Sequence, residues 1–141
     1  VARPPLRPAM STLRRILIAD DDRECRACVI ELLGDLLGSD PNQRFEIVQA
    51  ENGEEALTII RRSPPRLALL DMHMPGQTGL EILEALRRET LDVPCIVISG
   101  EASEAVRKHA LVFGARAVLK KPVEPRLLRD EVRRALHIDA A

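Results

Sequence analysis

Short apolar runs alternate along the chain with stretches in which apolar residues recur every three or four positions. The short runs are rich in β-branched residues and are bounded by polar or turn-forming residues, which is typical of buried strands. The longer stretches place their apolar side chains on one face, the pattern of an amphipathic helix. We predict five strands, at Ile16 to Ala19, Glu46 to Ala50, Leu67 to Leu70, Cys95 to Ile98 and Ala117 to Leu119. We predict five helices, at Glu24 to Leu37, Glu54 to Arg62, Leu80 to Glu89, Ser103 to Phe113 and Pro125 to Leu136.

The strict alternation of strand and helix has a consequence for topology. Strands joined by helices run parallel, and right-handed crossovers place helices on both faces of the sheet. Turn-forming residues fall at the predicted helix ends, with Gly38 to Asn42 after the first helix, Asn52-Gly53 before the second and Gly114 after the fourth. The sequence therefore predicts an α/β fold with a doubly wound, five-stranded parallel sheet.

Composition narrows this prediction to one domain with an aliphatic core. The 141 residues are 45% hydrophobic but only 1% aromatic, so aliphatic side chains must fill the interior. This length suits a single domain. Residues 1–13 interleave prolines with arginines and lack apolar periodicity. We expect a disordered arm or a leader added for expression at 1–13, and one domain over 14–138.

The charge balance argues against several classes of partner. A formal net charge of −1 provides no positive field for nucleic acid or an anionic membrane. No apolar run reaches the roughly 20 residues that span a bilayer, and no stretch resembles a signal peptide. We therefore expect a cytoplasmic protein that binds neither nucleic acid nor membrane directly.

The cysteines do not indicate a disulfide framework, because there are only three of them. Cys25 and Cys28 form a Cys-x-x-Cys pair, which can serve redox chemistry or zinc binding. No second pair completes a four-ligand zinc site. We interpret both residues as small, core-facing positions of the first helix.

Acidic residues follow two of the predicted strands at their carboxyl ends, where open parallel sheets bind ligands. The first strand is followed by Asp20, Asp21 and Asp22, and the third by Asp71. Carboxylates gathered at one sheet edge repel one another unless a cation compensates them. Mg²⁺ prefers a few carboxylate or carbonyl oxygens and readily adds a phosphate oxygen. We therefore predict a Mg²⁺ site that serves a phosphoryl group.

Two further strand ends supply groups that suit a phosphate. Ser99 follows the fourth strand with a hydroxyl donor, and Lys121 lies just after the fifth with a point charge. Asp71 is a plausible acceptor, because aspartyl phosphates are recognised covalent intermediates. Lys120 points to the opposite side of its strand and is interpreted as a surface residue. Asp22 is interpreted as a helix cap rather than a metal ligand.

Four motifs carry a resemblance to the response-regulator receiver family. They occur in the family's order at family-like spacing, and together they extend over the chain from about Arg14 to Leu136. Each motif alone is weakly specific, whereas the set of four is strongly specific. The motifs are Ile16-Leu17-Ile18-Ala19-Asp20-Asp21-Asp22, Leu69-Leu70-Asp71-Met72-His73-Met74-Pro75 with Gly79, Ile96-Val97-Ile98-Ser99, and Leu119-Lys120-Lys121-Pro122.

The resemblance implies a flavodoxin-like receiver fold with strand order 2-1-3-4-5. It also implies that Asp71 is the phosphoacceptor and a metal ligand. Asp21 would bind Mg²⁺ directly, Asp20 would act through water, and His73 would lend its backbone carbonyl. Mn²⁺ would substitute for Mg²⁺ at the same site.

The resemblance further assigns Lys121 to phosphoryl binding and Ser99 as the switch hydroxyl. In such proteins this hydroxyl moves toward the phosphoryl group and shifts a conformational population. The Lys121–Pro122 peptide resembles one that is cis in the family. Val118 departs from the family, which usually carries an aromatic residue there, so the usual coupling between hydroxyl and ring is in doubt.

The resemblance implies a switch that works with protein partners. The phosphodonor would be a histidine of a sensor kinase or of a phosphotransfer protein. A downstream protein would bind the face formed by the fourth helix, fifth strand and fifth helix. The chain would be a monomer or weak homodimer, and would catalyse only its own phosphoryl transfer and autodephosphorylation.

Two alternatives use the same residues differently. A phosphatase of the haloacid-dehalogenase type also has an aspartyl nucleophile and Mg²⁺, but it needs a second acid two residues later, where this chain has His73. A receiver-shaped scaffold that no longer uses phosphate is supported only by Val118. The complete acidic site disfavours this scaffold.

Overall fold

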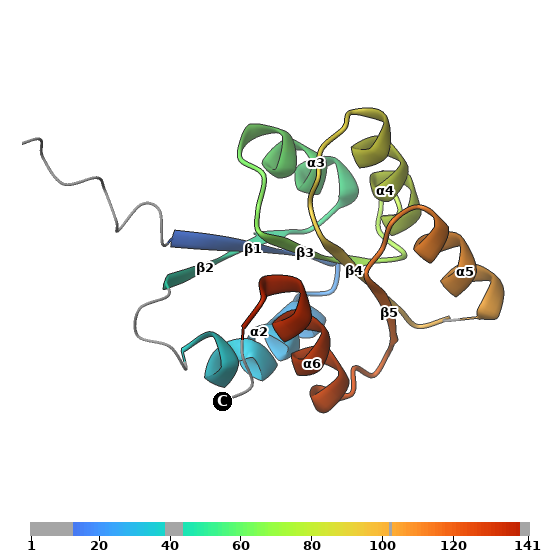
Figure 1. Ribbon diagram of the computed structural model, residues 1–141. Coiled ribbons are helices and arrows are strands. Elements are labelled where there is room, and N and C mark those ends of the chain that lie inside the picture. The colour runs from blue at the N-terminus through green and yellow to red at the C-terminus, as the bar shows by residue number, and fades with distance from the viewer. Residues whose placement is uncertain (1–12, 39–43, 102, 139–141) are drawn as a thin grey trace, which may run out of the picture.

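The chain folds as the predicted α/β sandwich of helices around a parallel sheet. The structure is a computed structural model, and it describes residues 13–38, 44–101 and 103–138. Within these ranges five strands pair in parallel in the order β2-β1-β3-β4-β5, which confirms the predicted order (Figure 1). The strands are β1 (Leu13–Ala19), β2 (Arg44–Ala50), β3 (Leu67–Asp71), β4 (Cys95–Ser99) and β5 (Ala117–Lys120). The helices are α2 (Arg23–Leu37), α3 (Gly53–Arg62), α4 (Gly79–Arg88), α5 (Glu104–Val112) and α6 (Pro125–Leu136).

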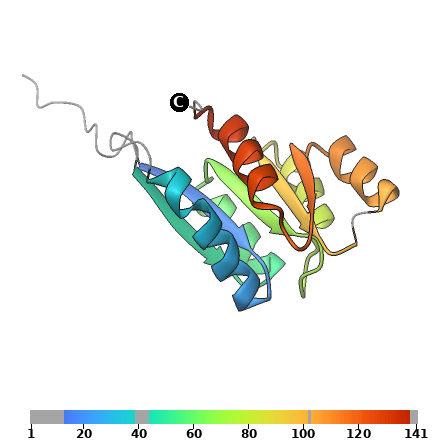
Figure 2. The same cartoon turned by 90° about the horizontal axis from the view of Figure 1, so that it is seen from below.

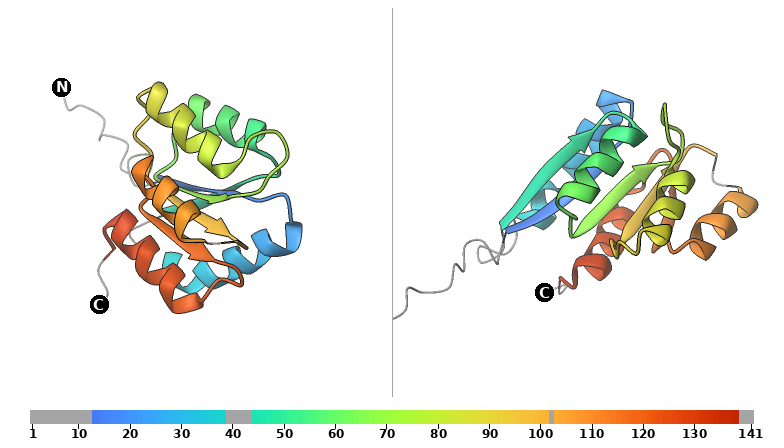
Figure 3. Two further views of the ribbon diagram at one scale, coloured as in Figure 1. Left: turned by 90° about the vertical axis from the view of Figure 1, so that its right-hand side faces the viewer. Right: turned by 90° about the horizontal axis from the view of Figure 1, so that it is seen from above.

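Helices cover both faces of the sheet, and each face has its own aliphatic core. Figure 2 shows α2 and α6 side by side on one face, and Figure 3 shows α3, α4 and α5 on the other. Alternate residues of β3 serve the two cores, so that Leu69 packs toward α2 and α6 while Leu70 packs toward α3 and α4. Burying one such leucine stabilises the fold by about 1.5–3 kcal/mol. The strand that presents Asp71 is therefore anchored from both sides.

The two neighbouring strands β1 and β2 are longer than the hydrophobic pattern predicts. Their parallel pairing begins at Leu13 with Arg44, before the buried run starts at Ile16. Backbone pairing does not require apolar side chains, so the pattern could not reveal this part. The other element bounds agree with the predictions to within one residue. Residues 1–12 and most of the turn predicted after α2 lie outside the described residues.

The predicted helix ends and special backbone positions are confirmed. The Asp22 side chain caps α2 by accepting hydrogen bonds from the backbone N–H groups of Glu24 and Cys25. The Asn52 side chain caps α3 by accepting one hydrogen bond, from the backbone N–H of Glu55. Gly114 has a φ of 97°, as expected after a helix, and the Lys121–Pro122 peptide is cis.

The interpretation of the cysteine pair is wrong in one respect. Cys25 is half-buried, but Cys28 is exposed. Successive helix residues are about 100° apart, so Cys28 lies well away from the stripe that contains Val29 and Leu33.

Among the helices that the structure describes, none combines the length and apolar character needed to cross a bilayer.

Candidate functional site

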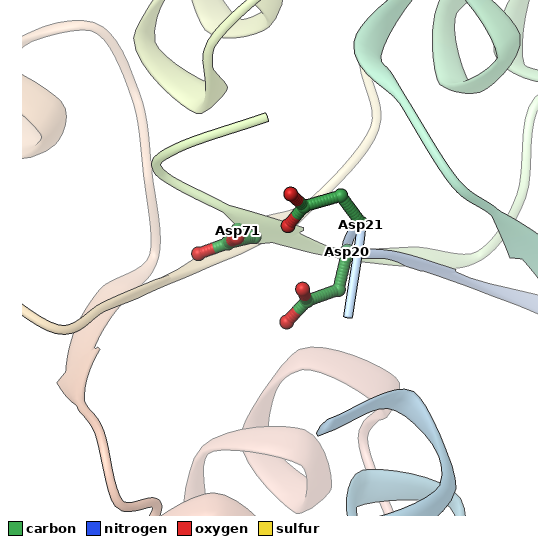
Figure 4. Close-up of side chains that lie close together, drawn as sticks. All are labelled: Asp20, Asp21 and Asp71. Atoms are coloured by element: carbon green, nitrogen blue, oxygen red, sulfur yellow. The ribbon is translucent and has the colours of Figure 1, made fainter. Parts of the chain in front are cut away.

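Three carboxylates meet at the carboxyl edge of the sheet. Asp20 and Asp21 directly follow β1, and Asp71 is the last residue of β3, the strand beside it. Each of the three offers a carboxylate oxygen, and these oxygens lie within 4.8 Å of one another (Figure 4). Asp20 and Asp71 are buried, whereas Asp21 is exposed. The structure thus brings together the three acids that the sequence singled out.

Lys121 joins the acids from the loop after β5. Its Nζ lies 3.0 Å from Asp20 Oδ2 and 3.2 Å from Asp71 Oδ1. One lysine does not balance three carboxylates, because the four side chains still carry a formal charge of −2, as three negative charges and one positive charge give. A divalent cation would balance that remainder.

The hydrogen bonds of Asp20 distinguish it from Asp21. Asp20 Oδ1 accepts a bond of 2.8 Å from the backbone N–H of Asp22, and Oδ2 accepts one of 3.0 Å from Lys121. Both oxygens of Asp20 are therefore already engaged. The exposed Asp21 carboxylate forms no hydrogen bond or ion pair with the described residues, which leaves it the freer of the two to bind a cation.

The pKa of Asp71 is raised above its usual range. Burial is the main cause, followed by the charge of Asp20, while Lys121 and the backbone N–H of His73 act in the opposite direction. The pKa of Lys121 is raised to about 12; its own burial works against this rise, and its contacts with Asp20 and Asp71 produce it. The lysine is therefore a fixed positive charge at neutral pH, and metal-free Asp71 holds its negative charge at an energetic cost.

A titration of the metal-free protein should show this cost directly. We expect the Asp71 side-chain carbon, followed by ¹³C NMR, to titrate above the ordinary value of 3.8. Mg²⁺ should move the midpoint down, because a cation beside the carboxylate favours its charged form. A midpoint at or below the ordinary value without metal would contradict the account of the site.

Arg26 belongs to the support of this site and was missed in the sequence. It lies on α2 and is only 5% exposed. Its Nη1 donates to the backbone carbonyl of Asp20 at 2.6 Å, and its Nε donates to Gln49 Oε1 at 2.9 Å. It thus ties the end of β1, where the acids begin, to β2. A charged residue within the apolar stripe of α2, one turn from Val29, was the available signal.

Arg26→Met should reveal this role, because methionine keeps much of the volume and removes both hydrogen bonds. We expect a loss of about 2–4 kcal/mol in the free energy of unfolding, since the two bonds from this charged donor contribute about 1.5–3 kcal/mol each and burial of the methionine side chain offsets part of their loss. Urea unfolding measures this change. Arg23→Met, at an exposed position of the same helix, should cost less than about 0.5 kcal/mol. Equal stability of the two variants would refute the role.

The loop after β3 is held close to the acids by Gly79. Its backbone N–H donates to the carbonyl of Met72 at 3.1 Å, and a Cβ at this position would lie 2.9 Å from the carbonyl oxygen of Asp71. Only glycine lets α4 begin this close to β3. The tight turn carries His73, whose side chain is exposed.

Ser99 lies at the end of β4, beside the β3 strand that carries Asp71, and is fully buried. Its hydroxyl accepts a hydrogen bond of 3.1 Å from the backbone N–H of Glu101. The hydroxyl does not contact the carboxylates in the described part of the chain, so it is near the site without belonging to the ion-paired group.

Lys120 is exposed, which confirms that only one of the two adjacent lysines faces the acids.

Comparison with known proteins gives a consistent result. The family model described as "Response regulator receiver domain" matches residues 16–133. The transcriptional regulatory protein CpxR of Escherichia coli is 36% identical over 88% of this chain and 50% of that protein. The phosphate regulon transcriptional regulatory protein PhoB of Pseudomonas aeruginosa is 33% identical over 82% of this chain and 48% of its own length. The chain thus spans about half the length of these curated relatives.

Solved structures of similar fold match this chain over nearly their whole length. The signal receiver domain of NarL from Mycobacterium tuberculosis has a TM-score of 0.77 and 29% identity, covering 89% of this chain and 98% of that one. The chemotaxis protein CheY4 of Vibrio cholerae has a TM-score of 0.73 and 26% identity, covering 88% and 99%. The family match covers the carboxyl ends of the two strands that carry the acids.

Proposed function

Because the chain belongs to the response regulator receiver domain family of two-component systems, we propose that it is a switch that accepts a phosphoryl group on Asp71. The observation that carries the proposal is the group of three carboxylates within 4.8 Å, two of them bridged by Lys121. The donor would be a phosphohistidine of a sensor kinase or of a phosphotransfer protein.

The donor set fits Mg²⁺ or Mn²⁺. Hard oxygen ligands and an uncompensated charge of −2 suit a small divalent cation. Asp21, Asp71 and the backbone carbonyl of His73 would hold the ion, with Asp20 acting through water. When bound, such an ion draws the phosphoryl oxygens to the site and neutralises their charge.

The chain's own residues account for the remaining requirements of the transfer. An oxygen of the ionised Asp71 forms a bond to phosphorus as the bond from phosphorus to the donor imidazole nitrogen breaks. The donor ring carries a proton on its other nitrogen, so it leaves as neutral imidazole. No general base is needed, because the attacking carboxylate carries no proton. Lys121, held at the site by Asp20, offsets the charge of the phosphoryl oxygens.

Ser99 provides a route from phosphorylation to a change of conformation. Its oxygen already accepts from Glu101, so its O–H proton is available to donate to a phosphoryl oxygen. A movement toward Asp71 would carry the segment that leads into α5. Val118 is buried and has no ring to turn. The switch in this chain would therefore act through the loop.

The face formed by α5, β5 and α6 would bind the downstream protein. Three large apolar side chains are exposed on its helices: Leu111 and Val112 on α5 and Leu127 on α6. Exposed apolar groups of this kind favour protein contacts. We propose no direct contact with nucleic acid or membrane, a cytoplasmic location, and a monomer or weak homodimer.

The two alternatives are less well supported. A phosphatase of the haloacid-dehalogenase type needs a second acid at the position of His73. The only catalysis that we propose is therefore the chain's own phosphoryl transfer and autodephosphorylation. A scaffold that uses no phosphate chemistry would not explain why buried acids cluster around Lys121.

Beryllofluoride, a mimic of an aspartyl phosphate, tests the switch. In the presence of Mg²⁺ we expect it to shift the backbone NMR signals of Ser99, Gly100 and Lys121, and to leave the Asp71→Asn variant unchanged. Shifts confined to the immediate neighbours of Asp71 would contradict the switch. The absence of any shift would support the scaffold.

A further inference from the structure

A hollow lies at the amino ends of the strands, on the edge of the sheet opposite the acids. It has a volume of about 220 Å³ and is bordered by Arg14, Arg66 and Arg116. Arg14 is in β1, and the other two arginines directly precede β3 and β5. The strand order brings these separate segments to one edge. No residue of this hollow takes part in the proposed phosphoryl chemistry.

The hollow carries an excess of positive charge. Three arginines face one acid, Asp92, which leaves a formal charge of +2 when His137 is neutral. One Arg14 nitrogen donates to the carbonyl of Leu136 at 3.3 Å and so offsets the partial negative charge at the end of α6. A purely structural role in capping helix ends therefore accounts for Arg14.

The same explanation does not account for Arg66 and Arg116. Their guanidinium groups form no ion pair or hydrogen bond with any residue that the structure describes. Asp92 lines the same hollow without pairing with them, although ion pairs are common elsewhere on this surface. Within the part of the chain that the structure describes, the two guanidinium groups thus keep their donors available beside one cavity.

The chemistry of the lining favours a phosphate group. The planar guanidinium fork matches the oxygens of a phosphate in bidentate geometry. A phosphomonoester carries a charge of about −1.5 to −2 at neutral pH, close to the excess in the hollow. Pro65, Pro94 and Leu136 give it an apolar floor. The volume lies below the roughly 300–1,000 Å³ of pockets for drug-sized ligands, which suits a small molecule.

We propose that this hollow binds a small phosphomonoester or orthophosphate through Arg66 and Arg116. A ligand that engages both residues ties the start of β3 to the start of β5. Because it binds the folded state, it also raises resistance to unfolding. The site would give the chain a second input, independent of phosphorylation at Asp71.

NMR titration of the full chain with orthophosphate and with glycerol 3-phosphate tests the proposal. A chelator keeps the acidic site free of metal, and potassium chloride at matched ionic strength controls for screening. We expect saturable shifts of the Arg66 and Arg116 amide signals, without shifts at Asp71. The double variant Arg66→Gln, Arg116→Gln should weaken binding at least about tenfold, because each lost charged bond contributes about 1.5–3 kcal/mol.

The matched control is Arg62→Gln, which removes the same charge from an exposed position of α3 outside the hollow. It should leave the affinity unchanged. Tighter binding of glycerol 3-phosphate would identify an organic ligand that uses the apolar floor, and equal binding would identify the phosphate group alone. Shifts that do not saturate, that chloride reproduces, or that survive in the double variant would overturn the proposal.

Discussion

The Asp71→Asn variant is expected to take up no phosphoryl group and, without Mg²⁺, to unfold at a higher urea concentration than the wild-type chain. Asparagine has no anionic oxygen to attack phosphorus, so uptake from a labelled phosphodonor should fall to background. The gain in stability follows from the raised pKa of Asp71, which burial and the charge of Asp20 produce. Asparagine fits the same space without that charge.

The stability gain should depend on pH in a defined direction. A carboxyl whose pKa is higher in the folded state than in the unfolded chain destabilises the fold at all pH values above the folded pKa. This penalty disappears as the pH falls through the folded pKa, because the buried group takes up a proton. The difference between Asp71→Asn and wild type should therefore be largest near neutral pH and shrink in acid.

Urea unfolding at neutral and acidic pH measures this difference, with unchanged slopes taken as evidence of an unchanged unfolded state. Asp35→Asn is the matched control, because Asp35 is exposed on α2 and has no partner in the described residues. It should leave both uptake and stability unchanged. If the Asp71→Asn variant still gained a phosphoryl group, another residue would be the acceptor.

Lys121→Met is expected to change two properties in opposite directions. Phosphoryl uptake should fall by about 100- to 1,000-fold, the usual effect of removing one electrostatic contact to a developing charge. The affinity for Mg²⁺ should rise, because Lys121 Nζ now lies 3.0 Å and 3.2 Å from two of the acids that would neighbour the ion. Removing this competing charge leaves the acids with a formal charge of −3.

Calorimetric titration with Mg²⁺ and initial rates of uptake measure the two effects. Lys120→Met is the matched control, since Lys120 is the adjacent lysine but is exposed and points away from the acids. It should leave both values unchanged. Weaker Mg²⁺ binding in Lys121→Met would mean that the lysine organises the acids rather than competing for them.

The sequence predicted the fold and the acidic group because both depend on patterns of short range. Alternating apolar runs marked the strands, and an acid directly after a buried strand lies at the carboxyl edge whatever the packing details are. The period of two along β5 distinguished Lys121 from Lys120. The receiver resemblance then added the strand order, which periodicity alone does not provide.

Features that depend on tertiary packing were not predictable in the same way. The burial of Arg26 requires Gln49 and the carbonyl of Asp20 as partners, and both come from other elements. Arg66 and Arg116 read as ordinary loop residues, 50 positions apart, until the strand order brings them to one hollow. The exposure of Cys28 depends on which flank of α2 meets α6.

The central claim is that the acidic group lets Asp71 accept a phosphoryl group only when a divalent cation neutralises it. The most direct test is the intact mass of the wild-type chain after incubation with a small phosphodonor, once with Mg²⁺ and once with a chelator. We predict one added phosphoryl group with Mg²⁺, located on Asp71, and none with the chelator. Equal addition under both conditions, or no addition under either, would contradict the account.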